Sequence, residues 1–213
     1  MEPTECVGRK RVIRMSIRAV LTGSLGFAAV SVGAFSLWAF GGRWFHSHGG
    51  DAAMYSAIAA AFLVLSGAIL HTLIRGERPL ARFYGAFVPA FLAYAVLWCV
   101  AWFVIKGPTG EWLGSLFGSF AFAAVVTKRL GGKSHICVTG LFVFIAHSVG
   151  YFMGGKLMYG ILGGAFADCL QGWSKDQIGI VAKLGWGLLY GLGFGAGIGI
   201  AFDRAQQGRP VTP

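Results

Sequence analysis

The chain alternates between long apolar stretches and short polar connections that carry most of its charged residues. Six apolar stretches have the length and composition of a membrane-spanning helix, which needs about 20 mainly apolar residues to cross about 30 Å of hydrocarbon. None shows the two-residue alternation of a membrane β-barrel strand. The pattern therefore predicts an all-α integral membrane protein, a bundle of about six transmembrane helices over Ala19–Phe40, Ala52–Ile74, Phe83–Ile105, Trp112–Thr127, Ile136–Met153 and Ile178–Phe202.

Composition supports this class of protein. Of the 213 residues, 56% are hydrophobic and only 12% are charged, whereas a soluble domain carries about 25% charged residues. A disordered chain needs few apolar residues and much charge, so it is excluded as well. The eight acidic residues leave little material for a soluble enzyme that works through carboxylates.

The formal net charge of +10 comes from basic clusters that lie between the apolar stretches. These clusters lack the interleaved aromatic residues of a nucleic-acid-binding face, so no nucleic acid partner is predicted. With the N-terminus in the cytoplasm and the sides alternating, thirteen of the eighteen Lys and Arg residues fall in cytoplasmic segments and four in outer segments. This positive-inside bias predicts that both termini are cytoplasmic.

The short connections are typical of a protein of the bacterial inner membrane. The expected organisation is a basic cytoplasmic N-terminal segment (residues 1–18), a six-helix transmembrane domain (19–203) and a short cytoplasmic tail (204–213). The first apolar stretch follows a basic segment, as in a signal peptide, but exceeds the about 7–15 residues of a signal peptide's apolar region. We therefore expect a retained first helix.

The segment between the fifth and sixth stretches, Gly154–Gln177, is half apolar. Its apolar part is too short to cross a bilayer. An interfacial helix, a re-entrant half-helix and a glycine-rich outer loop all fit this segment, and the interfacial helix is the favoured interpretation.

The sixth stretch carries the most distinctive pattern in the chain, a row of glycines at every fourth residue. Glycine inside a helix costs about 1 kcal/mol relative to alanine, a cost that is offset in lipid when a second helix approaches closely. We predict that this face packs within the bundle; contact with another copy of the chain and a flexible helix beside a substrate site are the alternatives. The row consists of Gly187, Gly191, Gly195 and Gly199, and a neighbouring row of Gly193 and Gly197.

Ionisable residues inside a span are expensive and are treated first as functional candidates. His147 lies near the middle of the fifth stretch and Lys183 lies near the outer end of the sixth. These two residues form the candidate intramembrane polar site. The interpretations of His147 are a hydrogen-bond partner between helices, a proton or substrate group, and a metal or haem ligand, whereas Lys183 is close enough to the outer surface to extend its ammonium group into water.

The first outer connection holds a short H-x-H motif, formed by His46 and His48 with Asp51 nearby. Imidazole suits Zn, Cu and Ni, so these residues are the candidate metal ligands. The four cysteines show no C-x-x-C spacing, and no nucleotide-binding or hydrolase motif is present. No bound cofactor is expected.

Three classes of function fit this sequence, and the lipid bilayer is a partner in all of them. A transporter or channel for a small solute would form its cavity from the third stretch, kinked at Pro89, the sixth stretch and the connection that precedes it. A non-catalytic membrane subunit or scaffold would pack through the glycine face against a second copy or a partner subunit. A haem- or metal-binding membrane enzyme or electron carrier, the least favoured class, would use His147 or the H-x-H motif.

Overall fold

The computed structural model describes residues 16–132 and 135–207, and over these residues it contains helices and no strands. Within this described part, six α-helices follow one another, and a single 3-10 turn, η1 (His71–Leu73), comes directly after the second. The helices are α1 (Ile17–Ser47), α2 (Gly50–Leu70), α3 (Pro79–Ile105), α4 (Gly107–Arg129), α5 (Ile136–Leu162) and α6 (Lys175–Ala205).

Each predicted apolar stretch forms a helix that is long and apolar enough to span a membrane. Large apolar side chains also point outward along these helices, such as Val64, Phe103 and Val104, which are 66%, 64% and 76% exposed. An outer surface of this kind is suited to lipid and not to water. The all-helical part of the prediction is therefore confirmed, and the six helices are compatible with a multi-pass membrane protein.

Local signals set several of the helix ends. The Ser16 hydroxyl accepts a hydrogen bond from the Ala19 backbone N–H (3.4 Å) at the start of α1. At the start of α6, Ser174 and Gln177 form a reciprocal capping box, which satisfies two backbone donors that a helix N-terminus otherwise leaves unpaired. α3 continues without a break through Pro89.

The fifth helix is longer than the predicted stretch, which ended at Met153, because α5 continues to Leu162. Residues Met158 and Ile161 on this extension are buried together with Ala182 of α6. The extension is thus stabilised by apolar contacts with α6, which the sequence alone did not indicate. The favoured interfacial helix is wrong, since residues 163–172 form turns and, with 173–174, make a mostly exposed loop.

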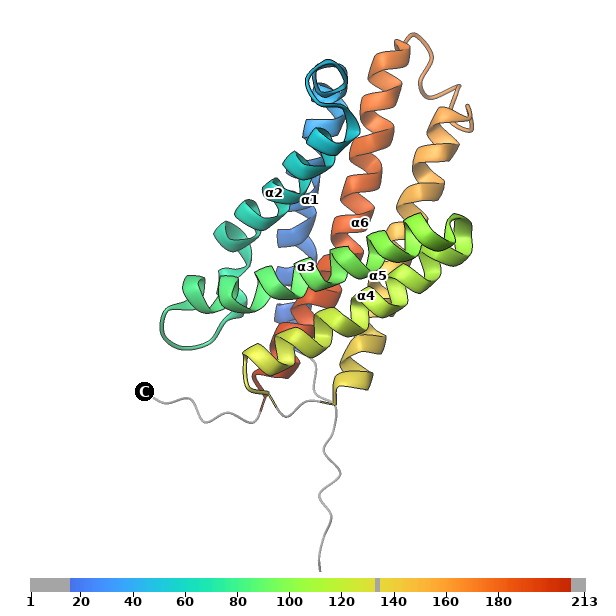
Figure 1. Ribbon diagram of the computed structural model, residues 1–213. Helices are drawn as coiled ribbons and strands as arrows, with labels where there is room; N and C mark the ends of the chain where they lie inside the picture. Colours follow the sequence, from blue (N-terminus) through green and yellow to red (C-terminus); the bar gives the residue numbers. More distant parts are fainter. Residues whose placement is uncertain (1–15, 133–134, 208–213) are drawn as a thin grey trace, which may run out of the picture.

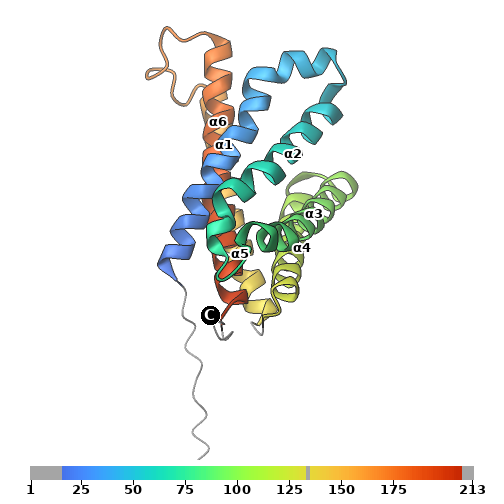
Figure 2. The same ribbon diagram turned by 90° about the vertical axis from the view of Figure 1, so that its left-hand side faces the viewer.

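α6 is the central helix of the fold, and it packs against α1 on one side and α5 on the other. α2 leans on α1, while α3 and α4 form a hairpin that crosses the other helices at a steep angle (Figure 1). α2 and this hairpin lie on the same side of α6 (Figure 2). We call the end with the α1–α2 and α5–α6 connections the loop end, and the end with the start of α1 and the end of α6 the terminal end (Figure 1 and Figure 2).

The four-residue glycine row of α6 faces α1. A Cβ atom added at Gly191 would lie 2.6 Å from the Cα atom of Ala28, and one at Gly195 would lie 2.7 Å from the Cβ atom of Phe27. A hydrogen bond from the Ser24 hydroxyl to the Leu192 carbonyl oxygen (2.9 Å) joins the same two helices. The backbones of α1 and α6 therefore approach so closely that no side chain fits between them.

The neighbouring glycine row faces α5. A Cβ atom at Gly193 would lie 2.7 Å from the Cα atom of Gly150, and one at Gly197 would lie 3.1 Å from the Cα atom of Val143. α6 thus uses two glycine rows to contact two helices at backbone distance.

Aromatic side chains fill the space that these close contacts leave on the side of α3 and α4. The Phe194 ring of α6 lies 5.5 Å from the Phe27 ring of α1 and 5.5 Å from the Phe122 ring of α4. Nearer the terminal end, the Phe83 ring of α3 stacks on the Phe202 ring of α6 at 5.2 Å. All five rings are fully buried, so the centre of the bundle is packed and not open.

The α1–α6 contact makes a direct prediction for the variant Gly191→Leu. The new side chain would collide with the backbone of Ala28, and overpacking of this kind lowers the free energy of unfolding by about 1–3 kcal/mol. Thermal or chemical unfolding in detergent micelles measures this loss. Gly85→Leu is the matched control, because a Cβ atom at Gly85 meets nothing within 4 Å; equal stability of the two variants would contradict the packing described.

Candidate functional site

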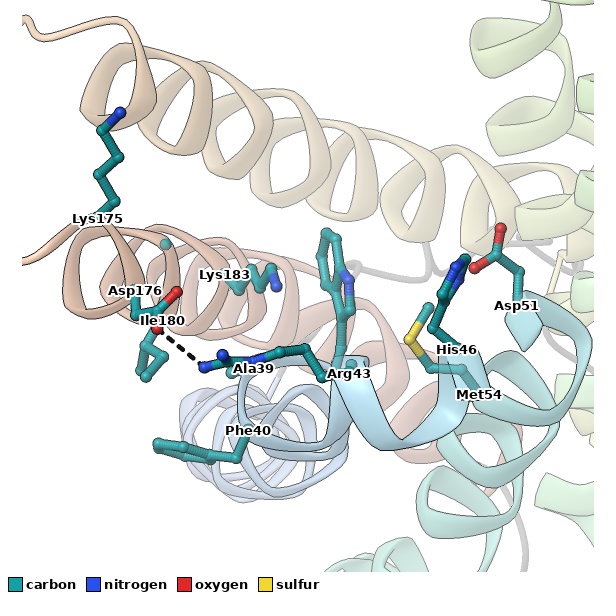
Figure 3. Close-up of a pocket in the computed structure, with 13 residues that line it drawn as sticks. Ala39, Phe40, Arg43, His46, Asp51, Met54, Lys175, Asp176, Ile180 and Lys183 are labelled. Atoms are coloured by element: carbon teal, nitrogen blue, oxygen red, sulfur yellow. Dashed lines mark hydrogen bonds and ion pairs between the residues drawn. The ribbon is translucent and has the colours of Figure 1, made fainter. Parts of the chain in front are cut away.

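A cavity of about 670 Å³ opens at the loop end, between the end of α1, the start of α2 and the start of α6. Figure 3 shows its charged side chains projecting from these three helices. Of the segments expected to form a cavity, the sixth stretch and the end of the connection before it line this one, the latter through Lys175 and Asp176, which belong to α6 in the structure; α3 contributes no residue. Seven of the lining residues matter for the chemistry of the site: Trp38, Arg43, His46, Asp51, Lys175, Asp176 and Lys183.

The charged groups of the cavity are partly paired. The Arg43 guanidinium donates to the Asp176 carboxylate at 2.8 Å, and both side chains are strongly exposed, as the dashed line in Figure 3 shows. The Lys183 ammonium lies deeper, 5.0 Å from the centroid of the Trp38 ring. The sequence identified Lys183 as a polar residue of the sixth helix, and the structure places it at the bottom of this cavity.

Below Lys183, a column of aromatic rings continues toward the centre of the bundle. The Trp38 and Trp186 rings are 5.9 Å apart, and the Trp186 ring lies 5.7 Å from that of Tyr151. Tyr151 stacks in turn on His147 at 5.8 Å. The cavity is therefore closed below by aromatic side chains, and the column leads from Lys183 to His147.

His147 is completely buried in the middle of the bundle. Its Nε2 atom lies 2.6 Å from the Tyr94 hydroxyl of α3, and its Nδ1 atom has no hydrogen-bond partner among the described residues. The rings of Tyr190 and Phe194 stand edge-on to the imidazole at 5.7 Å and 5.2 Å. The site is thus one imidazole enclosed by aromatic rings, with one nitrogen bonded and one unbonded.

The two histidines of the H-x-H motif lie in different surroundings. His46 lines the loop-end cavity, whereas His48 stacks on the Trp44 ring at 4.7 Å and its Nδ1 atom lies 2.9 Å from the Trp44 carbonyl oxygen. Within residues 16–132 and 135–207, no three His, Cys, Asp or Glu side chains are placed so that they could hold a metal ion.

A second polar cluster, which the sequence analysis missed, lies at the terminal end. The Asp203 carboxylate, near the end of α6, is buried and pairs with Arg75 from the connection between α2 and α3. It also accepts hydrogen bonds from the Ser16 backbone N–H at 3.2 Å and from Gln207 Nε2 at 3.0 Å. One carboxylate therefore joins the start of α1, the α2–α3 connection and the end of α6.

The neighbouring residues extend this cluster. Arg204 is buried, and its Nε atom donates to the Thr139 hydroxyl of α5 at 2.9 Å. Gln206 accepts from the Arg75 backbone N–H at 2.8 Å and donates to the Leu73 carbonyl oxygen at 2.9 Å. A carboxylate in the last turn of a helix interacts unfavourably with the negative end of the helix dipole. The position of Asp203 near the end of the sixth apolar stretch was therefore the one sequence signal that a positively charged partner lies nearby.

Comparison with models of known protein families, with curated proteins and with solved structures finds no match for this chain. The functional argument therefore rests on the geometry of the loop-end cavity, the enclosed His147 and the terminal-end cluster.

The two ion pairs of the described residues differ in burial, and this difference predicts different responses to mutation. Asp203→Asn removes the charge from a carboxylate whose side chain is 3% exposed, opposite an Arg75 that is 54% exposed. We expect the free energy of unfolding to fall by about 3 kcal/mol. This is the lower limit of the loss that is usual when a buried ion pair loses one partner, because Arg75 stays partly exposed.

Asp176→Asn is the matched control for Asp203→Asn. It breaks a pair whose side chains are 91% and 71% exposed, and such surface pairs contribute at most about 1 kcal/mol. Chemical unfolding of both variants in the same micelle provides the comparison. Equal losses would show that the Asp203 cluster does not hold the terminal end together.

Proposed function

We propose that this chain is a transporter or channel that carries a small solute across a membrane, and that the loop-end cavity is the solute entrance. The observation that carries the proposal is where this cavity lies. Three helices able to span a membrane form it, and the column of aromatic rings that closes it below reaches His147 of α5. Its volume of about 670 Å³ falls in the range of about 300–1,000 Å³ that is usual for small-molecule sites.

The difference between the two ends of the bundle supports a transport cycle. The loop end is open around the cavity, whereas the terminal end is tied together by Asp203 and its partners. Transporters that work by alternating access are closed on one side of the solute site while they are open on the other. The conformation described here corresponds to a state open at the loop end.

The orientation that we propose follows from the distribution of Lys and Arg. Among the described residues, most Lys and Arg lie toward the terminal end, at the start of α1, around the α2–α3 and α4–α5 connections and at the end of α6 (Figure 1). The positive-inside rule then favours a cytoplasmic terminal end and a cavity on the outer side. In this arrangement the protein takes up or releases solute at the outer face of a bacterial inner membrane.

The scaffold alternative requires a glycine face that is free to meet another chain. Gly191 and Gly195 are buried and face α1, and Gly193 and Gly197 face α5. Association with a second copy or with a partner subunit would therefore have to use other surfaces. This favours the transporter over the scaffold.

The variant Gly179→Trp tests the proposal without a known solute. Gly179 lines the cavity, and a Cβ atom there meets nothing within 4 Å, so the indole fills the cavity while the fold is kept. Proteoliposomes are incubated with a small-molecule extract of the cells that produce the protein, washed, and analysed by mass spectrometry. We expect at least one solute to accumulate with the wild type, and its accumulation to fall at least tenfold with Gly179→Trp.

Gly155→Trp is the matched control, because its Cβ atom also meets nothing within 4 Å but the residue lies outside the cavity. This variant should accumulate the same solutes as the wild type. The proposal is overturned if wild-type vesicles take up no more of any solute than protein-free vesicles, or if the two tryptophan variants behave alike.

A further inference from the structure

The charges that line the loop-end cavity do not balance. Three of the lining residues are basic, Arg43, Lys175 and Lys183, and two are acidic, Asp51 and Asp176. Arg43 and Asp176 neutralise one another in an ion pair. Within the described ranges of the chain, neither lysine has a carboxylate oxygen within 4 Å.

Lys183 is the deepest of these charges. It lies eight residues after the first residue of α6, which is about 12 Å along the helix. Its side chain is only partly exposed, and it reaches from α6 toward α1, where Trp38 is also partly buried (Figure 3). An ammonium group that loses water without gaining a counter-charge is unfavourable, and the Trp38 ring offsets only part of that loss.

The cavity also has an apolar wall. Phe40 and Ile180 line it beside the charged groups, as does Met54 at the start of α2. Small-molecule sites combine apolar walls with a few polar groups that fix the orientation of the ligand. A ligand that suits this cavity carries a negative group for the lysine and an apolar part for the wall.

We propose that the loop-end cavity binds a small organic anion, a carboxylate or a phosphate, with Lys183 as its counter-charge. The inference rests on the proposed function and names the class of its solute. The anionic group lies against the Lys183 ammonium at the cavity floor, above Trp38, and Lys175 at the mouth adds positive potential. A lipid phosphate offers the same negative group, so the experiment separates a free anion from a lipid headgroup.

Equilibrium binding tests this assignment independently of transport. The purified chain is placed in phosphatidylcholine nanodiscs, and binding is measured by saturation-transfer NMR with benzoate, benzyl alcohol and benzylamine, three probes that share one ring and differ in charge. Inorganic phosphate serves as a competitor. We expect benzoate to bind at least tenfold more tightly than the other two ring probes and phosphate to displace it.

Three variants test whether the Lys183 ammonium is the counter-charge of the bound anion. Lys183→Ala should weaken benzoate binding at least tenfold, whereas Lys183→Arg should keep the preference for the anion. Lys156→Ala is the matched control, because Lys156 is an exposed lysine of α5 outside the cavity, and it should bind benzoate as the wild type does. Thermal unfolding of each variant verifies that the fold is retained.

The outcomes separate this inference from the proposed function. Equal binding of the three ring probes, or benzoate binding unchanged in Lys183→Ala, overturns the anion site even if solute uptake is observed. Benzoate that binds through Lys183 while vesicles accumulate no solute supports the anion site and overturns the transporter. A lipid ligand gives a third outcome. If phosphatidylglycerol in the nanodiscs abolishes benzoate binding, and native mass spectra show it bound to the wild type but not to Lys183→Ala, the anion site is supported and its ligand is a lipid phosphate.

Discussion

The rest of the structure depends on the backbone contact of α6 with its two neighbours. Lipid supplies no hydrophobic force that pushes helices together, so packing at short range has to do so. Gly191 and Gly195 allow α1 to approach α6, and Gly193 allows α5 to do the same. With α6 held between these two helices, its aromatic residues point to the side where α3 and α4 lie.

The two ends of α6 then take on different properties. Toward the terminal end, Phe202 and the buried Asp203 fix the helix to α3 and to the α2–α3 connection. Toward the loop end, α1 and α6 are held by an exposed ion pair and enclose a cavity with Lys183 at its floor. The same helix pair is thus tightly fixed at one end and open at the other, which is the asymmetry that the proposed transport cycle requires.

The sequence predicts the number and type of the helices because each span has to be apolar over its whole length. It also predicts that His147 is unusual, since an ionisable residue in a span is rare. Its partner Tyr94 escaped prediction, because tyrosine occurs equally on apolar surfaces and in cores. The cavity was not predicted either, because its position depends on which helices are neighbours. The spacing of the glycines predicts a close helix contact, but it does not indicate which helix makes that contact.

The proposed function requires that the loop-end part of α6 borders a cavity accessible to water from outside the cell, while the middle of α6 is sealed by protein. Single cysteines introduced along α6 in a background without the four native cysteines, and exposed in intact cells to a membrane-impermeant thiol reagent, measure this directly. The account predicts rapid labelling of Ile180→Cys from outside and no labelling of Tyr190→Cys or Gly197→Cys. Labelling of Ile180→Cys only after the membrane is opened, or labelling of Tyr190→Cys and Ile180→Cys at equal rates, would contradict it.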